Sequence, residues 1–241
     1  RLSVFAGGFS LEAVETICSG DSVEVRQALD LLTHLVDKSL VMVDQQGEGA
    51  RYRLLETVRQ YGRDRLLASR QAEEVRARHR DWYVELAEQA ESMLAGPDEA
   101  WLDRLDKEQD NLRAAIDFSL RSGQAEAALR LGAALWPFWQ VRGYWTEGRQ
   151  WLEAALDGSR GAPPALRAKA IRGAGELAQY QGDHERAQTL SEESLALFRA
   201  LGDKHGMARA LSTLGNVAYH QGDYTAAGEL HEESLVYGRE L

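Results

Sequence analysis

The chain has 241 residues, of which 44% are hydrophobic and 27% charged, and its formal net charge is −10. This length is enough for one large or two small domains with their own cores. No apolar run reaches the ~18 residues of a membrane span, so we expect no membrane-spanning segment. Residues 1–80 carry equal numbers of basic and acidic side chains. The negative charge therefore belongs to residues 81–241, which we expect to repel phosphate backbones.

The ends of the chain and its single cysteine give two further expectations. The chain starts at Arg1 without a methionine and stops at Leu241 within a helical pattern, so we expect a fragment of a longer protein. Cys18 is the only cysteine, and no internal disulfide can form. A reducing cytoplasm is the location that this predicts.

Residues 1–80 do not repeat and predict a small mixed unit. Residues 11–20 have the pattern of a short amphipathic helix. A second helix is predicted within 23–40, where six apolar residues share one face: Val25, Ala28, Leu29, Leu32, Leu35 and Val36. Residues 39–45 and 51–55 are strand candidates around a Gln-Gly-Glu-Gly turn, and helical periodicity returns at 56–69. This order indicates a winged helix with one small sheet, confined to residues 39–56.

The C-terminal part of the chain repeats itself with a period of forty residues. Thirteen of the 31 positions in 171–201 are identical to those in 211–241. Each unit has the pattern of two helices, in which Gly182 or Gly222 ends the first helix and Asp183 or Asp223 caps the second. Because neither helix pair can bury its apolar face alone, the pattern predicts stacked repeats.

Earlier units of the same kind are visible but degenerate. Gly143 and Gly123 stand at turns between helical stretches, and Pro137 lies inside one such stretch, where it should kink the helix or shift its start. From about Glu108 we expect seven helices in antiparallel succession. The predicted divisions are a winged-helix domain at 1–66, a helical linker at 67–107 and repeats at 108–241, which makes the fold mostly α.

The repeat resembles the tetratricopeptide repeat. Small or aromatic residues fall at the offsets that this family uses, and they are Gly215, Ala218, Gly222, Ala227 and Ser234 in one unit and Gly175, Ala178, Gly182, Ala187 and Ser194 in the other. The usual period is ~34 residues. Six extra residues shared by two helices predict about one more turn in each.

A second resemblance covers the whole chain. The segments "RLSVFAGGFSLEAVETIC", "LLTHLVDKSLV", "YRLLETVRQYGRDRL" and "WLDRLDKEQDNLRAAIDFSL" are similar to the part that follows the ATPase core in bacterial signal-transduction ATPases with numerous domains, which are related to the NB-ARC group. Many of these are transcriptional regulators of LuxR or AfsR type. The resemblance implies a preceding nucleotide-binding domain, then a winged helix, then repeats that sense a partner.

One position departs from that family. Its winged helix carries a Met-His-Asp motif whose His touches the nucleotide phosphates, and here Leu54, Leu55 and Glu56 align with it. Leu55 cannot donate a hydrogen bond to phosphate. No Lys follows a Gly, so a phosphate-binding loop is also missing from the sequence. We expect this chain to bind neither ATP nor ADP and to be no enzyme by itself.

Other chemistry is weakly indicated. The six His residues are scattered, without the spacing of metal ligands, and we expect no metal and no cofactor. Cys18 is better explained as a buried side chain than as a nucleophile. The six Trp residues cluster in the degenerate repeats, where core packing or a ligand cage could explain them.

Residues 51–80 contain nine Arg against four acidic residues. One hypothesis is that this run lets the winged helix bind DNA. The other is a solvated face, or a face that docks an absent ATPase domain. The predicted helix at 25–37 offers only Arg26 against Glu24, Asp30 and Asp37, and nucleic acid is therefore an unlikely partner in our interpretation.

The predicted binding surface is the concave side of the repeats. In tetratricopeptide repeats the first helix of each unit lines this side, and the family's inward positions are here Lys169, Arg172, Glu176, Gln179, Tyr180, Arg209, Ser212, Asn216, Tyr219 and His220. Lys169, Arg172 and Arg209 would form a cationic strip that suits a carboxylate or an acidic peptide. Changing Arg172 and Arg209 to Glu should then remove the response to an effector with little change in melting temperature.

The sequence thus predicts a non-enzymatic sensor that binds a protein, peptide or small-molecule effector and relays it to an absent ATPase and output domain. The alternative is a nucleic-acid-binding regulator that uses the winged helix and residues 51–80.

Overall fold

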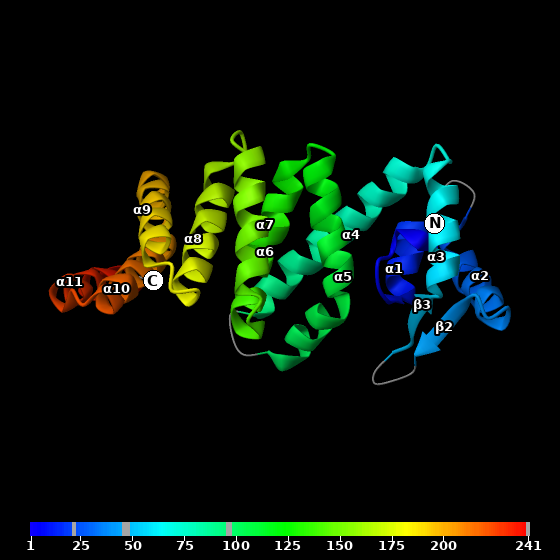
Figure 1. Cartoon of the computed structure of the whole chain (residues 1–241), viewed down its shortest axis with the longest axis horizontal. Helices are drawn as coiled ribbons and strands as arrows, with labels where there is room; N and C mark the ends of the chain where they lie inside the picture. Colours follow the sequence, from blue (N-terminus) through cyan, green and yellow to red (C-terminus); the bar gives the residue numbers. More distant parts are fainter. Residues whose placement is uncertain (21–22, 45–48, 95–97, 240–241) are drawn as a thin grey trace. The chain divides into compact units, whose positions relative to one another are not determined.

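The computed structural model describes residues 1–20, 23–44, 49–94 and 98–239, and these ranges contain eleven α-helices and three short strands (Figure 1). The expectation of a mostly α fold is confirmed. Contacts divide the chain into two compact units, residues 1–89 with 96–118 and residues 90–95 with 119–241. The three-part division into 1–66, 67–107 and 108–241 stays a prediction.

The first unit contains an antiparallel sheet with the strand order β1 (Phe9–Ser10), β3 (Arg51–Leu54), β2 (Val41–Asp44). β2 and β3 form the predicted hairpin, in which Val43 pairs with Tyr52. Its turn, at residues 45–48, lies outside the described residues. The expectation that the sheet is confined to residues 39–56 is wrong, because Phe9 pairs with Tyr52 at the other edge of β3.

The helices of the first unit are α1 (Leu11–Cys18), α2 (Val25–Asp37), α3 (Glu56–Leu67) and the larger parts of α4 (Ala72–Met93) and α5 (Glu99–Arg121), preceded by a 3-10 helix (Leu2–Val4). The apolar face predicted for α2 is only partly buried. Ala28 and Leu32 are in the core, whereas Val25 is 56% and Leu29 is 45% exposed. The unit therefore leaves apolar surface on α2 in contact with solvent.

A buried polar network joins three distant parts of the first unit. Glu108 on α5 accepts hydrogen bonds from Arg51 on β3 (2.5 Å) and from the Tyr83 hydroxyl on α4 (2.8 Å). The Asn111 amide donates to the Gly8 carbonyl at 2.8 Å and accepts from the Ala6 backbone N–H at 2.9 Å. Because these groups are largely removed from water, each needs its partner, and the network ties α5 to the N-terminal segment and the hairpin.

The second unit is built from helix pairs. Its helices are α6 (Ala125–Arg142), α7 (Trp145–Gly158), α8 (Pro164–Tyr180), α9 (His184–Leu201), α10 (Lys204–Gln221) and α11 (Tyr224–Arg239). Each helix packs on the next along the chain, and α6 and α8 also contact each other, as do α8 and α10 (Figure 1). With α5, this gives the seven successive helices that the sequence predicts in this part of the described chain.

The turns between paired helices follow the local sequence. Gly182 and Gly222 have φ of +76° and +86°, the left-handed conformation that favours glycine. The Asp183 and Asp223 side chains accept hydrogen bonds from backbone N–H groups in the first turns of α9 and α11. α6 continues through Pro137 from Ala125 to Arg142, so the helix is not shifted to start at the proline.

Small residues bring the paired helices close together. A methyl group added at Gly215 on α10 would lie 2.7 Å from the His231 ring on α11, and one at Gly175 on α8 would lie 3.1 Å from the Ser191 hydroxyl on α9. Gly206 on α10 faces the buried Phe198 ring of α9 in the same way. These contacts leave no room for a larger side chain.

The same substitution at two glycines should have opposite effects on stability. Gly206→Ala places a methyl group into the Phe198 ring, and we expect it to lower the free energy of unfolding by roughly 2 kcal/mol. Gly228→Ala on the exposed side of α11 meets no atom within 4 Å and should raise it by roughly 0.5–1 kcal/mol, because Ala favours helix. Urea unfolding of both variants checks this, and equal signs would contradict the packing described here.

His79 on α4 should make the first unit sensitive to acid. It is 3% exposed and lies between Phe5 and Tyr83. Burial lowers the pKa of His79 to about 4 from an ordinary value of 6.5, although a hydrogen bond with Asn111 acts in the opposite direction. Below pH ~6.5 the unfolded state then binds a proton that the folded state does not.

We therefore expect the contribution of His79 to stability to be complete above about pH 6.5 and to fall by on the order of 3 kcal/mol as the pH drops towards about 4. His79→Phe should lose this part of the pH dependence. Urea unfolding from about pH 7 to about pH 5 measures it. Parallel pH profiles of the two proteins would contradict the assignment.

Candidate functional site

The predicted binding surface lies on α8 and α10, the first helices of two successive pairs. All ten predicted positions on α8 and α10 lie outside the core: Lys169, Arg172, Glu176, Gln179 and Ser212 are half-buried, and Tyr180, Arg209, Asn216, Tyr219 and His220 are exposed. We call these ten residues the inner surface. Its role in binding stays a prediction.

The centre of the inner surface is a desolvated ion pair. Arg172 and Glu176 lie one turn apart on α8, and the distance from the Arg172 guanidinium to the Glu176 carboxylate is 3.4 Å. Their side chains are only 13% and 16% exposed. The Arg172 guanidinium also lies 4.8 Å from the centre of the Trp136 ring on α6. Burial lowers the pKa of Arg172 and raises the pKa of Glu176, so both charges are costly here unless they are paired. Arg172 is therefore held in place by its neighbours.

The three predicted cations differ in how far they are available. The Lys169 ammonium forms an ion pair with Glu91 on α4 at 2.5 Å, and Arg172 is paired with Glu176. Arg209 is exposed, and within the residues described its side chain has no recorded hydrogen bond or ion pair. The cationic strip thus contains two neutralised charges and one cation that an incoming carboxylate can reach.

Aromatic rings line the edge of the inner surface where the first helices end. Tyr180 at the end of α8 accepts a hydrogen bond from the Gln140 amide at 2.7 Å, and its ring centre lies 5.6 Å from that of Trp145. One repeat later, the rings of His184 and His220 stack at 5.3 Å. The same relation between neighbouring pairs therefore recurs with different rings.

Several residues of this surface were missed at the sequence level. For Trp136 and Trp145 the sequence left core packing or a ligand cage open, and Glu91 and Gln140 received no role. Tyr224 on α11 is 68% exposed and its ring centre lies 5.3 Å from that of Tyr219. The spacing of about forty residues from Trp145 to His184 and Tyr224 was the available signal.

The basic run at residues 51–80 is largely engaged in local contacts. Arg51 pairs with Glu108, Arg59 with Glu56, Arg78 with Glu74 and Arg80 with Asp81. By contrast, Arg53, Arg63 and Arg70 are exposed, and among the described residues they have no ion pair. In the part of the chain that is described, these ion pairs therefore neutralise four of the nine arginines of this run.

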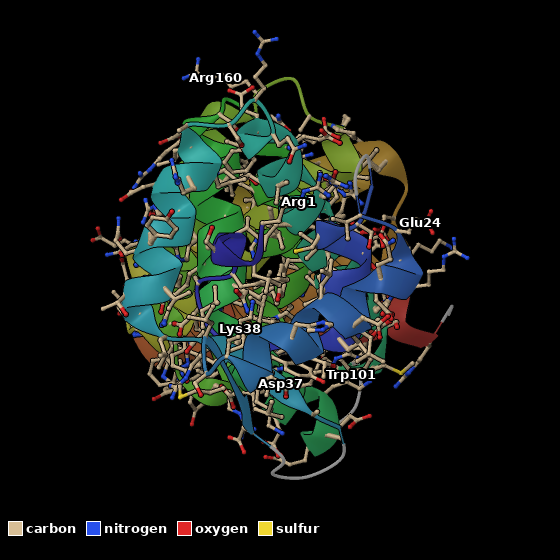
Figure 2. The ribbon with its side chains drawn as sticks, turned by 90° about the vertical axis from the view of Figure 1, so that its right-hand side faces the viewer. Arg1, Glu24, Asp37, Lys38, Trp101 and Arg160 are labelled. Carbon is tan, nitrogen blue, oxygen red and sulfur yellow. The ribbon has the colours of Figure 1, made fainter. Side chains whose placement is uncertain are left out.

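The surface of α2 is apolar and acidic. Glu24 stands at its start and Asp37 at its end (Figure 2), and Leu31 between them is 48% exposed. Arg26 is paired with the neighbouring Glu24. DNA phosphates are bound mainly by Lys and Arg side chains, and the surface of this helix offers few of them for contact with a DNA backbone.

Other chemical roles find little support in the described residues. They contain no group of three or more His, Cys, Asp or Glu side chains placed to hold a metal ion. Burial raises the pKa of Cys18 to about 11, which keeps the thiol protonated and unreactive at neutral pH. Leu55, at the position of the family's nucleotide-sensing His, is 38% exposed just before α3. No helix in the described ranges combines the length and apolarity that a bilayer crossing requires.

Two family models match separate parts of the chain. Residues 1–67 match the winged helix-turn-helix domain, and residues 166–235 match the tetratricopeptide repeat. Both matches agree with the two resemblances seen in the sequence.

Curated relatives extend the similarity. The chain is 36% identical over 219 residues to "Putative HTH-type transcriptional regulator Rv0890c" of Mycobacterium tuberculosis and to its counterpart in Mycobacterium bovis. These alignments cover 88% of this chain and 25% of each relative, so the chain spans about a quarter of their length. An uncharacterized protein of M. tuberculosis is 43% identical over 81 residues, covering 33% of this chain and 21% of that protein.

A solved structure is also similar, with a TM-score of 0.41 and 14% identity, over 98% of this chain and 49% of the other. It is the signal transduction ATPase with numerous domains (STAND) protein with a tetratricopeptide repeat sensor, PH0952 from Pyrococcus horikoshii. From the family models and the curated relatives, the chain joins a winged helix-turn-helix domain to tetratricopeptide repeats, and over most of its length it is similar to mycobacterial proteins named as HTH-type transcriptional regulators.

Proposed function

We propose that this chain is the sensor part of a cytoplasmic transcriptional regulator, in which the inner surface binds a protein, peptide or small-molecule effector and transmits that state to an ATPase and an output domain elsewhere in the protein. The chain itself catalyses no reaction in this proposal. The observation that carries it is Arg209, which is exposed and has no side-chain ion pair among the described residues, on the same inner surface as the exposed rings and amides of α8 and α10.

The chemistry of the inner surface favours a peptide with an acidic group. Arg209 can donate charge-assisted hydrogen bonds to a carboxylate. Exposed Tyr180 and Tyr219 supply large contact area at low conformational cost, and Gln179 and Asn216 can pair with a peptide backbone. The similarity to proteins named as transcriptional regulators supports a regulatory role.

The structure changes which substitution can test this role. Arg172 contacts Glu176 and Trp136 in a desolvated place, so Arg172→Glu would set two carboxylates against each other and lower stability. The expectation that a double change of Arg172 and Arg209 leaves the melting temperature nearly unchanged is therefore withdrawn. Arg209→Glu alone tests the surface without breaking an ion pair that the structure records.

We expect a peptide array to show that this chain retains acidic peptides in preference to basic ones. Arg209→Glu should weaken the affinity for the best acidic peptide by roughly tenfold, because a carboxylate loses a charged partner and meets a like charge. Arg199→Glu is the matched control, since Arg199 is also exposed in the repeats but lies on α9 and pairs with Glu233. Fluorescence anisotropy with the labelled peptide gives both affinities. Equal retention of basic peptides, or equal effects of the two variants, would refute the proposal.

DNA contact by the winged helix is the second candidate function. The comparisons do not support the interpretation that nucleic acid is an unlikely partner, because residues 1–67 match a winged helix-turn-helix domain and the relatives are named HTH-type regulators. Against it stand the acidic ends of α2 and the pairing of many arginines in residues 51–80. The exposed arginines Arg53, Arg63 and Arg70 are the cations that could contact phosphate.

If this second function holds, mixed-sequence duplex DNA should bind the chain at low salt and dissociate as salt is raised. Arg53→Glu with Arg63→Glu should weaken the affinity by tenfold or more, in the order-of-magnitude range expected for losing two phosphate contacts. Arg199→Glu in the repeats should have no such effect. A gel shift that shows no wild-type complex at low salt would exclude this function.

A further inference from the structure

The space between three consecutive helices can be compared in two successive repeats. Between α9, α10 and α11, the space is filled by a hydrophobic cluster that includes Leu195, Phe198, Met207 and Leu211. Second helices correspond at a spacing of 39 residues from α7 to α9, and first helices at 40 residues from α8 to α10. The place between α7, α8 and α9 should therefore hold the equivalents of these four side chains.

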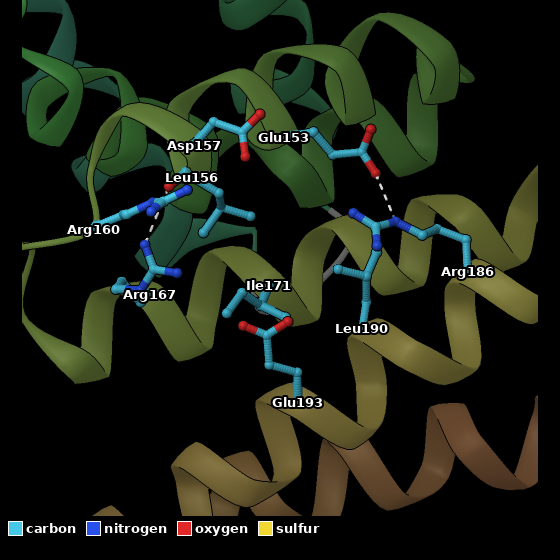
Figure 3. Close-up of a pocket in the computed structure, with 9 residues that line it drawn as sticks. All are labelled: Glu153, Leu156, Asp157, Arg160, Arg167, Ile171, Arg186, Leu190 and Glu193. Atoms are coloured by element: carbon cyan, nitrogen blue, oxygen red, sulfur yellow. Dashed lines mark hydrogen bonds and ion pairs between the residues drawn. The ribbon is translucent and has the colours of Figure 1, made fainter.

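Two of the four equivalents are no longer apolar. Leu156 and Ile171 correspond to Leu195 and Leu211, but Ser159 takes the position of Phe198 and Arg167 takes that of Met207. The Arg167 guanidinium donates to the Leu156 and Ser159 carbonyls, at 3.2 and 3.1 Å, near the end of α7. A cleft with a volume of about 330 Å³ lies where the next repeat has its core (Figure 3).

The surface of this cleft between α7, α8 and α9 is mainly polar and charged. Ile171 and Leu190 lie behind this surface, only 1% and 2% exposed, whereas Leu156 is half-buried, and the Arg186–Glu153 ion pair (3.1 Å) closes one end (Figure 3). Its volume is at the small end of the range of ligand pockets, about 300–1,000 Å³. This lining suits a small molecule that carries charged groups.

The mouth of the cleft holds charges that are paired in the next repeat. There Arg199 and Glu233 form an ion pair at 3.0 Å. Their equivalents Arg160 and Glu193 both line the cleft, and the described residues provide neither of them with an ion pair or hydrogen bond. Asp157 on the α7 wall is likewise without a recorded partner there. One cation and two carboxylates are thus available to a ligand.

We propose that this cleft binds a small zwitterion of the amino-acid class. Its carboxylate pairs with Arg160, its ammonium pairs with Glu193 and Asp157, and its side chain lies against the half-buried Leu156. A simple anion would meet the two carboxylates and a simple cation would meet Arg160, so only a molecule with both charges satisfies the site. The ligand would bridge Arg160 and Glu193, whose equivalents in the next repeat, Arg199 and Glu233, pair with each other directly.

The zwitterion site is separate from the inner surface. Arg167 and Ile171 lie one turn apart on α8, whereas Arg172 and Glu176 fall on roughly the opposite side of that helix at about 100° per residue. The proposal therefore does not rest on the function proposed for the inner surface, and either can fail without the other.

Calorimetry with three related probes tests the ligand class. L-leucine carries both charges, leucinamide lacks the carboxylate, and 4-methylpentanoate lacks the ammonium. We expect L-leucine to bind the full chain in the millimolar range or tighter, and each single-charge probe to bind at least about tenfold more weakly. No L-leucine binding at millimolar concentration, or equal binding of either single-charge probe, would overturn the proposal.

Variants then locate the site. Arg160→Ala and Glu193→Ala should each reduce L-leucine affinity by about tenfold, whereas Arg199→Ala, at the equivalent place in the next repeat, should not. Both target side chains are exposed, so the fold should tolerate their loss. Equal effects of Arg160→Ala and Arg199→Ala would assign any binding to another place and refute the site.

A third variant restores the packing of the next repeat. Ser159→Phe combined with Arg167→Met should fill the cleft, remove L-leucine binding and leave the far-UV spectrum helical. Retained binding with a folded double variant would refute the site. If the double variant does not fold, the single alanine variants at Arg160 and Glu193 decide the question.

Discussion

Close contact between paired helices is the constraint on which the repeat unit depends. Gly148 on α7 lies against the Trp139 ring of α6, Gly175 on α8 against Ser191 of α9, and Gly215 on α10 against His231 of α11. These contacts fix which side of each first helix faces its partner. The opposite side of the helix does not pack against this partner helix, and its polar and aromatic residues form the inner surface. A binding surface is thus a consequence of how a helix pair must pack.

Features that depend on local sequence could be predicted well. The turn glycines, the caps at Asp183 and Asp223 and the lengthened helices follow from residues within a few positions of each other. β1 could not be predicted, because two residues give no alternation and Phe9 is placed only by its pairing with distant Tyr52. The role of α5 in the first unit was equally hidden, since the bonds from Glu108 to Arg51 and from Asn111 to Gly8 each span more than fifty residues.

For the inner surface too, contacts between residues close in sequence could be predicted and contacts between distant residues could not. The inward positions implied by the resemblance to the tetratricopeptide repeat are residues of α8 and α10 that lie outside the core. The Arg172–Glu176 pair, four residues apart, was also within reach of sequence reasoning. The Lys169–Glu91 pair was not, because Glu91 lies on α4 and no spacing rule relates it to α8. Counting cations therefore overestimated the positive charge of this surface, which depends on which cations the fold has already neutralised.

Departures from a repeat are more informative than the repeat itself. A packing position can lose its apolar residue only if the resulting cleft is filled by water or by a ligand, since an empty apolar cavity costs stability. Phe198 and Met207 fill their packing positions with apolar side chains. Ser159 and Arg167, at the equivalent positions of the preceding repeat, are polar. Arg167 finds carbonyl partners, which accounts for its tolerance. Arg160 and Glu193 have no such partner in the described residues, and an unpaired cation facing an unpaired carboxylate across a cleft is the arrangement that packing alone does not explain.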